Sequence, residues 1–135
     1  MQNDLQIVWT NGCFDILHRG HIELFKYAKS LGDVLYVGID SDSKVKKDKG
    51  NKRPYNNEVD RIELLKSIKY IDKIFLFENS KQLDNIIQSI GPNIMVIGSD
   101  WKNKNIVGQC HSEKVVFFDR IPNYSTTNIL KCYHP

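Results

Sequence analysis

Short apolar runs alternate along this chain with segments whose apolar residues recur at helical spacing. Five runs are short and nearly continuously apolar, as in strands buried on both faces of a parallel sheet: residues 6–10, 34–39, 73–77, 94–98 and 114–118. Helical spacing falls between them, over residues 20–31, 58–69 and 83–90, and a last short helix follows residues 125–127. The alternation predicts a Rossmann-like, doubly wound α/β fold: a five-stranded, mainly parallel sheet with helices on both faces.

Residues 40–57 break the alternation, because they are polar, rich in lysine and contain Pro54. The pattern predicts a loop there. The next helix is expected to bury Val59, Ile62, Leu65 and Ile68 on one face. Ligands of doubly wound folds bind beyond the carboxyl ends of the strands. We therefore expect the site in residues 11–13, 40–50, 98–101 and 124–127.

Composition narrows the class of protein only a little. The chain has 135 residues, of which 41% are hydrophobic and 26% charged, which predicts one folded domain over 1–135. A net charge of +3 is too small and too scattered to indicate nucleic-acid binding. No apolar run reaches the roughly 18 residues of a membrane helix, and the first residues do not resemble a secretion signal. Three cysteines without Cys-x-x-Cys spacing suggest neither a disulfide framework nor a zinc site, so we expect a cytoplasmic protein.

The loop after the first predicted strand holds two histidines. His18 and His21 flank Gly20 at the mouth of a predicted helix, and Gly12 stands at the end of the strand. Glycines let the backbone approach a phosphate closely, and a helix N-terminus adds free N–H groups. The histidines could donate hydrogen bonds to charge that builds on a phosphoryl group during transfer. The alternative is that they are structural or bind a metal.

A second polar string lies near the carboxyl end. Arg120 and Tyr124 precede Ser125-Thr126-Thr127, which stands at a predicted helix start. Hydroxyls and backbone N–H groups there can bind triphosphate oxygens, with Arg120 as a further cation. Taken alone, the string could be a plain helix cap.

Both strings match one family. Residues 12–21, read as Gly-x-Phe-Asp-x-Leu-His-x-Gly-His, resemble the signature of the cytidylyltransferase-like nucleotidyltransferases, and residues 120–127 resemble their second motif. The nucleotidyltransferase domain of the bifunctional ADP-heptose synthases is similar at more positions, including Arg53-Pro54-x-Asn56. Glycerol-3-phosphate cytidylyltransferase is similar in Asp100-Trp101 and in Arg120.

The resemblance implies an in-line attack by an acceptor phosphate on the α-phosphorus of a nucleoside triphosphate. It assigns catalysis to His18, His21 and Lys46. It assigns acceptor binding to Asp15, Lys46, Lys49 and Arg61. Asp15 could instead brace the histidine loop. The lysines of a polar stretch and an arginine on a helix can equally be ordinary surface residues. The nucleotide is assigned to Gly12, Cys13, Phe14, Gly20, Gly98, Asp100, Trp101, Arg120, Tyr124, Ser125, Thr126 and Thr127.

Trp101 could stack on the base or simply pack. No metal cage of the protein's own is expected, because Mg²⁺ would arrive with the triphosphate. By resemblance, the protein is expected to be a homodimer.

The leading hypothesis is transfer of a nucleoside monophosphate from ATP or CTP to a phosphorylated sugar similar to heptose 1-phosphate, with release of pyrophosphate. Synthesis of CDP-glycerol from CTP is the first alternative. Pantetheine-phosphate and nicotinamide-mononucleotide adenylyltransferases share the two-histidine loop, but Ser125-Thr126-Thr127 counts against them. A non-catalytic, nucleotide-binding regulator is the alternative from a different class.

Overall fold

The computed structural model describes residues 4–122 and 124–133, and it contains one five-stranded sheet. In chain order the elements are β1 (Ile7–Gly12), α1 (Arg19–Ser30), β2 (Val34–Asp40), α2 (Asp42–Lys49), α3 (Glu58–Lys66), β3 (Lys73–Phe77), α4 (Ser80–Ile90), β4 (Ile94–Gly98), β5 (Lys114–Phe118) and α5 (Thr126–Tyr133), with 3₁₀ turns at Ser99–Trp101 and Gln109–His111. The strand order is β3-β2-β1-β4-β5 and every pairing is parallel. The predicted doubly wound fold is confirmed.

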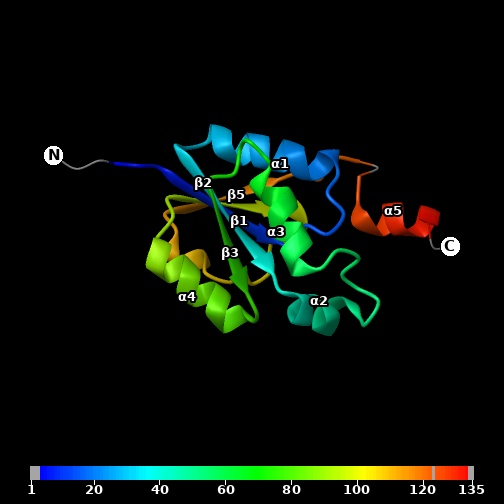
Figure 1. Cartoon of the computed structure of the whole chain (residues 1–135). Helices are drawn as coiled ribbons and strands as arrows, with labels where there is room; N and C mark the ends of the chain where they lie inside the picture. The colour runs from blue at the N-terminus through cyan, green and yellow to red at the C-terminus, as the bar shows by residue number, and fades with distance from the viewer. Residues whose placement is uncertain (1–3, 123, 134–135) are drawn as a thin grey trace.

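Helices α1 and α3 cover one face of the sheet and α4 the other (Figure 1), and an apolar cluster lies on each face. On one face, Phe25 and Ala28 of α1 and Leu65 of α3 pack against the strands. On the other face, Leu83 and Ile87 of α4 do the same. Strands covered on both sides bury nearly every side chain, which explains the continuous apolar runs in the sequence.

Trp9, at the centre of β1, shows how tightly the strands are fitted. It is fully buried, and its Nε1 donates to Asn11 Oδ1 at 2.8 Å. A Cβ on Gly38 of the neighbouring strand would lie 2.5 Å from the Trp9 ring, so a glycine is required there.

The loop predicted over residues 40–57 is wrong in its first half, where the chain forms α2. Ser41 caps this helix by accepting a hydrogen bond from the Lys44 N–H, and Gly50 ends it with a φ of 101°. Three of its four lysines, Lys46, Lys47 and Lys49, stand in the last turn, where they complement the helix dipole. Apolar spacing missed α2 because Val45 is its one buried residue.

The buried face predicted for α3 is also wrong in part. Val59 is 67% exposed, whereas Arg61 is fully buried beside Leu65. The helix ends at Lys66, before Ile68. α4 begins at Ser80, earlier than predicted, because Asn79 caps it by accepting from the Gln82 N–H. No helix within the described ranges has the length and apolar character needed to cross a membrane.

Candidate active site

A cavity opens where β1 and β4 lie side by side and the strand order reverses. Its walls come from the loop after β1, from α2 and residue 53, from the end of β4, and from residues 118–127. The sequence-predicted residues that line it are Gly12, Cys13, Phe14, Asp15, His18, Gly20, His21, Lys49, Gly98, Asp100, Arg120, Tyr124, Ser125, Thr126 and Thr127. Ligands of doubly wound folds bind at this position, so the cavity is the candidate active site.

The loop between β1 and α1 places the histidines. Phe14 and Ile16 have φ values of 51° and 53°, a left-handed conformation that side chains of this size rarely adopt. The Phe14 ring is buried and packs against Phe25, with ring centroids 5.0 Å apart, and edge-on against His21 at 5.5 Å. This packing holds the loop in its tight path from strand to helix.

His18 and His21 form a reciprocal cap on α1. His18 Nδ1 accepts from the Gly20 N–H at 3.1 Å, and His21 Nδ1 accepts from the His18 N–H at 3.2 Å. The two rings stack with centroids 3.8 Å apart. Because each Nδ1 is an acceptor, a neutral ring must carry its proton on Nε2.

The surroundings keep both rings neutral. Burial lowers the pKa of His21 to about 3, assisted by repulsion from His18 whenever that ring is protonated and by the charges of Lys49 and Arg120. Burial and Arg120 also lower the pKa of His18. Among the residues that the structure describes, neither Nε2 has a hydrogen-bond partner. The cap therefore leaves two Nε2–H donors at the cavity, as stabilisation of a phosphoryl group requires.

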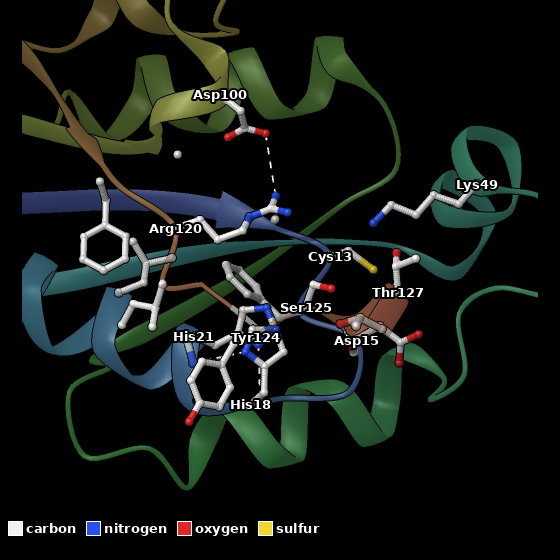
Figure 2. Close-up of a pocket in the computed structure, with 18 of the residues that line it drawn as sticks. Cys13, Asp15, His18, His21, Lys49, Asp100, Arg120, Tyr124, Ser125 and Thr127 are labelled. Carbon is white, nitrogen blue, oxygen red and sulfur yellow. Dashed lines mark hydrogen bonds and ion pairs between the residues drawn. The ribbon is translucent and has the colours of Figure 1, made fainter. Parts of the chain in front are cut away.

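The carboxyl-terminal segment forms the opposite wall. Figure 2 shows the Tyr124 ring beside His18, and the two rings are roughly parallel with centroids 6.2 Å apart. The Thr126 hydroxyl donates to the Asp15 carbonyl, which fastens the start of α5 to the histidine loop. Arg120 lies 3.7 Å from Asp100 Oδ2. The two motifs found in the sequence therefore meet in space.

The two candidate lysines of α2 have different positions. Lys49 lines the cavity, and Figure 2 shows its side chain extending from α2 toward Cys13. Lys46 does not line the cavity, and its Nζ donates to the Arg53 carbonyl at 3.2 Å. The structure therefore does not support the catalytic and acceptor-binding roles predicted for Lys46.

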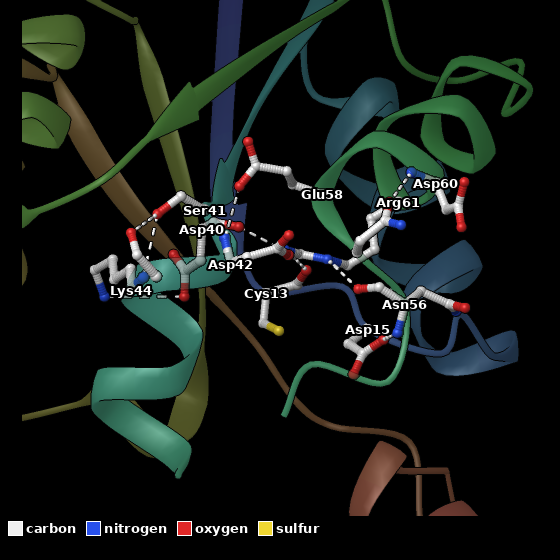
Figure 3. Close-up of polar contacts among 12 residues, drawn as sticks. Cys13, Asp15, Asp40, Ser41, Asp42, Lys44, Asn56, Glu58, Asp60 and Arg61 are labelled. Carbon is white, nitrogen blue, oxygen red and sulfur yellow. Dashed lines mark hydrogen bonds and ion pairs between the residues drawn. The ribbon is translucent and has the colours of Figure 1, made fainter. Parts of the chain in front are cut away.

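Arg61 does not line the cavity, so the acceptor-binding role predicted for it is wrong. Its guanidinium is fully buried and donates to the carbonyls of Asn56, Cys13 and Asp40 at 2.8–2.9 Å, and to Asp42 Oδ1 at 2.8 Å (Figure 3). It therefore joins the ends of β1 and β2 to α2 and α3, and the acceptor contact predicted for it does not fit this position.

Asp15 takes the second of its two predicted roles, bracing of the histidine loop, and not the acceptor contact. Its carboxylate is buried and accepts from the backbone N–H groups of Tyr55 and Asn56. It braces the histidine loop against residues 53–57. A buried carboxylate so engaged is unsuited to bind a phosphate, because both groups are anionic.

Trp101 lies outside the main cavity. It is 47% exposed and lines a smaller neighbouring cavity that shares Gly98 with the first. Lys104 Nζ lies 5.6 Å from its ring centroid. The structure therefore does not place Trp101 where the nucleotide was predicted.

Four lining residues were absent from the predicted set: Leu24, Arg53, Phe118 and Ile121. Leu24 stands one helical turn after His21, so the spacing could have indicated it. Arg53 belongs to the Arg53-Pro54-x-Asn56 string, to which the resemblance assigns no role.

Cys13 and Cys110 are free thiols, and burial raises the pKa of Cys13, which makes its thiol a poor nucleophile. Within the described part of the chain, no three His, Cys, Asp or Glu side chains form a group that could hold a metal ion.

Residues 9–131 match the family described as cytidylyltransferase-like. The chain belongs to this family. Membership in the cytidylyltransferase-like family confirms the predicted class of enzyme, a nucleotidyltransferase, and agrees with the two histidines found at the cavity.

Curated relatives include the bifunctional protein HldE of a Nitratiruptor species, 44% identical over 126 residues, and that of Campylobacter jejuni subsp. jejuni serotype O:6, 42% identical over 130 residues. These alignments cover 93% and 96% of this chain, but the chain spans only 27% and 28% of the length of those relatives.

Two solved structures are similar. The lipopolysaccharide core biosynthesis protein of Thermoplasma volcanium has a TM-score of 0.67 and 28% identity, over 90% of this chain and 99% of that protein. Pantoate-beta-alanine ligase of Francisella tularensis has a TM-score of 0.58 over 96% of this chain and 69% of the other, and at 18% identity it supports the fold alone.

Proposed function

We propose that the protein transfers a nucleoside monophosphate from ATP or CTP to a phosphorylated sugar of the heptose 1-phosphate kind and releases pyrophosphate. The observation that carries the proposal is the pair of neutral imidazoles that cap α1 with both Nε2–H groups available at the cavity. The identity to HldE proteins supports a sugar phosphate as acceptor, because the sequence resembles the nucleotidyltransferase domain of ADP-heptose synthases.

The transfer needs no nucleophile from the protein. An anionic oxygen of the acceptor phosphate attacks the α-phosphorus, a new phosphorus–oxygen bond forms, and the bond to the bridging oxygen breaks as pyrophosphate leaves with its electrons. The enzyme contributes position and charge stabilisation. His18 and His21 donate to the α-phosphoryl oxygens, where negative charge accumulates in the transition state.

The nucleotide lies, in this proposal, along the wall of Gly98, Asp100 and Arg120. Its phosphates meet the N-terminus of α5, where Ser125, Thr126 and Thr127 line the cavity and can offer backbone N–H groups and hydroxyls. Mg²⁺ would bind to the triphosphate oxygens and water, since the described residues offer no cage for it. When bound, it would neutralise the charge of the leaving pyrophosphate.

A specific observation favours one second candidate. Arg120 pairs with Asp100 at 3.7 Å on the cavity wall, and these are positions at which the sequence resembles glycerol-3-phosphate cytidylyltransferase. Glycerol 3-phosphate with CTP is therefore the substrate pair to compare with a heptose 1-phosphate.

The direct test is pyrophosphate release from ATP and from CTP, each in the presence of Mg²⁺ and one acceptor: a heptose 1-phosphate, another aldose 1-phosphate, or glycerol 3-phosphate. We expect release that depends on the acceptor and is highest with the heptose 1-phosphate. The double variant His18→Asn/His21→Asn, which keeps an acceptor atom near each Nδ1 position, is the matched control and should be inactive. Absence of release with every pair would favour a nucleotide-binding regulator.

A further inference from the structure

Arg53 lines the cavity, and among the described residues its side chain forms an ion pair with Asp15 but no hydrogen bond. Its side chain is only 17% exposed, and its Nε is buried without a hydrogen-bond acceptor. Nor do its terminal nitrogens donate to any residue in the described ranges. Nε faces Asp15 and is itself inaccessible, so the donors that can reach a ligand in the cavity are those of the terminal nitrogens. Guanidinium donors that lie against a cavity and are not used by the protein are suited to bind an anion there.

The nearest anion does not satisfy this arginine. Asp15 Oδ2 lies 3.7 Å from Arg53 Nε, which is too long for a hydrogen bond. Both carboxylate oxygens of Asp15 already accept backbone N–H groups, from Tyr55 and Asn56. Asp15 therefore balances the charge of Arg53 and leaves its donors available.

A second arginine nearby shows what a purely structural guanidinium looks like here. Arg61 is fully buried, and its three nitrogens make four hydrogen bonds to the protein. The Arg53 side chain makes none within residues 4–122 and 124–133, although both arginines contact the same histidine loop. Arg61 therefore has a structural role, whereas the terminal nitrogens of Arg53 remain available to a ligand.

Lys49 is the other cation on this side of the cavity. Its Nζ has no ion-pair or hydrogen-bond partner in the part of the chain that the structure describes, and Figure 2 shows it across the cavity from Asp100. A guanidinium offers parallel N–H groups that match two oxygens of a phosphate, and an ammonium adds a point charge. Both cations line the same cavity as Gly98, Asp100 and Arg120, but they come from other segments of the chain.

We propose that Arg53 binds the phosphate of the acceptor as a bidentate ligand, beside Lys49, which the family resemblance already assigns to the acceptor. The inference rests on the proposed function, in which the nucleotide occupies the Asp100–Arg120 wall. In-line transfer requires the attacking phosphate to approach the α-phosphorus opposite the leaving pyrophosphate. Arg53 would hold that phosphate at its oxygens and set its direction of attack.

The first experiment compares steady-state kinetics of wild type, Arg53→Gln and Arg53→Lys, with a heptose 1-phosphate as acceptor and ATP or CTP as donor. The control is Lys52→Gln, which removes a neighbouring, exposed charge outside the cavity. We expect Arg53→Gln to raise the KM of the acceptor at least about tenfold, the equivalent of one charge-assisted hydrogen bond. The KM of the nucleotide should change less than about twofold.

The outcome of Arg53→Lys separates ligand binding from fold support. Lysine keeps the positive charge but lacks the paired N–H groups of a guanidinium. The Arg53→Lys variant should therefore fold and still have a raised acceptor KM. Equal effects on both substrates, an effect on the nucleotide alone, or an unchanged acceptor KM in both variants would overturn the inference.

A second experiment requires no turnover and so distinguishes this inference from the proposed function. Binding of inorganic phosphate is measured by ³¹P NMR at constant ionic strength. Wild type and Lys52→Gln should bind it equally, and Arg53→Gln should bind it at least about tenfold more weakly. Full retention of phosphate binding in Arg53→Gln, or no binding by wild type, would overturn the inference even if pyrophosphate release is observed.

Discussion

His18 has two tasks that a substitution can separate. Its Nδ1 caps α1, and its Nε2–H is the donor that we assign to the α-phosphoryl group. His18→Ala removes both, so it should lower kcat by roughly a hundredfold or more and also destabilise the helix by about 1 kcal/mol. His18→Asn keeps a capping acceptor without the Nε2–H, so stability should recover while kcat stays low. Kinetics and urea unfolding of both variants measure this, and full activity of His18→Asn would exclude the donor role.

His21 makes stability depend on pH in a defined direction. Its folded pKa of about 3 lies below the ordinary value near 6.5, so between these values the unfolded chain binds a proton that the folded chain does not. Stability should therefore be complete above pH 6.5 and should fall as the pH drops toward 3, by up to ~1.4 kcal/mol per pH unit from this residue.

Carboxylates also titrate in part of this range, so the matched variant is His21→Asn. The slope of unfolding free energy against pH between about 6.5 and about 5 should be smaller in His21→Asn than in wild type. Identical slopes would show that His21 titrates normally in the folded protein.

At the scale of elements, the first turn of α1 fixes the imidazole geometry. A Cβ added to Gly20 would lie 2.9 Å from His18 Cε1 and 3.3 Å from the Tyr124 Cβ. Gly20→Ala should therefore displace the His18 ring and lower kcat/KM on the order of tenfold to a hundredfold. The exposed Lys26→Ala on the same helix should have no effect. Wild-type kcat/KM in Gly20→Ala would mean that the ring position is not critical.

Arg61 joins the ends of β1 and β2 to α2 and α3. Removing it leaves buried carbonyls of Cys13 and Asp40 without a donor, so Arg61→Met should destabilise the protein by on the order of 3 kcal/mol. Arg19→Met, at a side chain that is 70% exposed, is the control. Arg61→Lys cannot make four hydrogen bonds and should also be destabilised. If it kept wild-type stability but had a raised acceptor KM in the assay, the original assignment of Arg61 to the acceptor would be right.

The sequence predicted the strands and the helices of strong apolar spacing because the two-sided sheet buries them continuously. It missed α2, whose stability comes from a cap and from charge at its ends, which periodicity does not register. The histidine and Ser-Thr-Thr strings could be predicted to lie together, because ligands of doubly wound folds bind beyond the carboxyl ends of the strands. The position of Arg61 could not, because an arginine in a helix looks the same in sequence whether it contacts a substrate or a buried carbonyl, and for Asp15 the sequence left acceptor binding and bracing open.

At the scale of the whole molecule, the order β3-β2-β1-β4-β5 brings together segments that are far apart in the chain. The carboxyl ends of β1 and β4 lie side by side, and Thr126 and Asp15 meet across more than a hundred residues. The chain spans about a quarter of the length of its HldE relatives, so the single-domain assignment of 1–135 stays a prediction, as do the homodimer and the cytoplasmic location.

The most direct measurement is ¹⁵N NMR of the imidazoles of His18 and His21 at neutral pH, with and without ATP or CTP and Mg²⁺. Both rings should be neutral with the proton on Nε2, and the Nε2–H signals should shift when the nucleotide binds. Rings protonated on Nδ1, or Nε2–H signals unchanged by a nucleotide that demonstrably binds, would contradict the assignment of these histidines to the α-phosphoryl group.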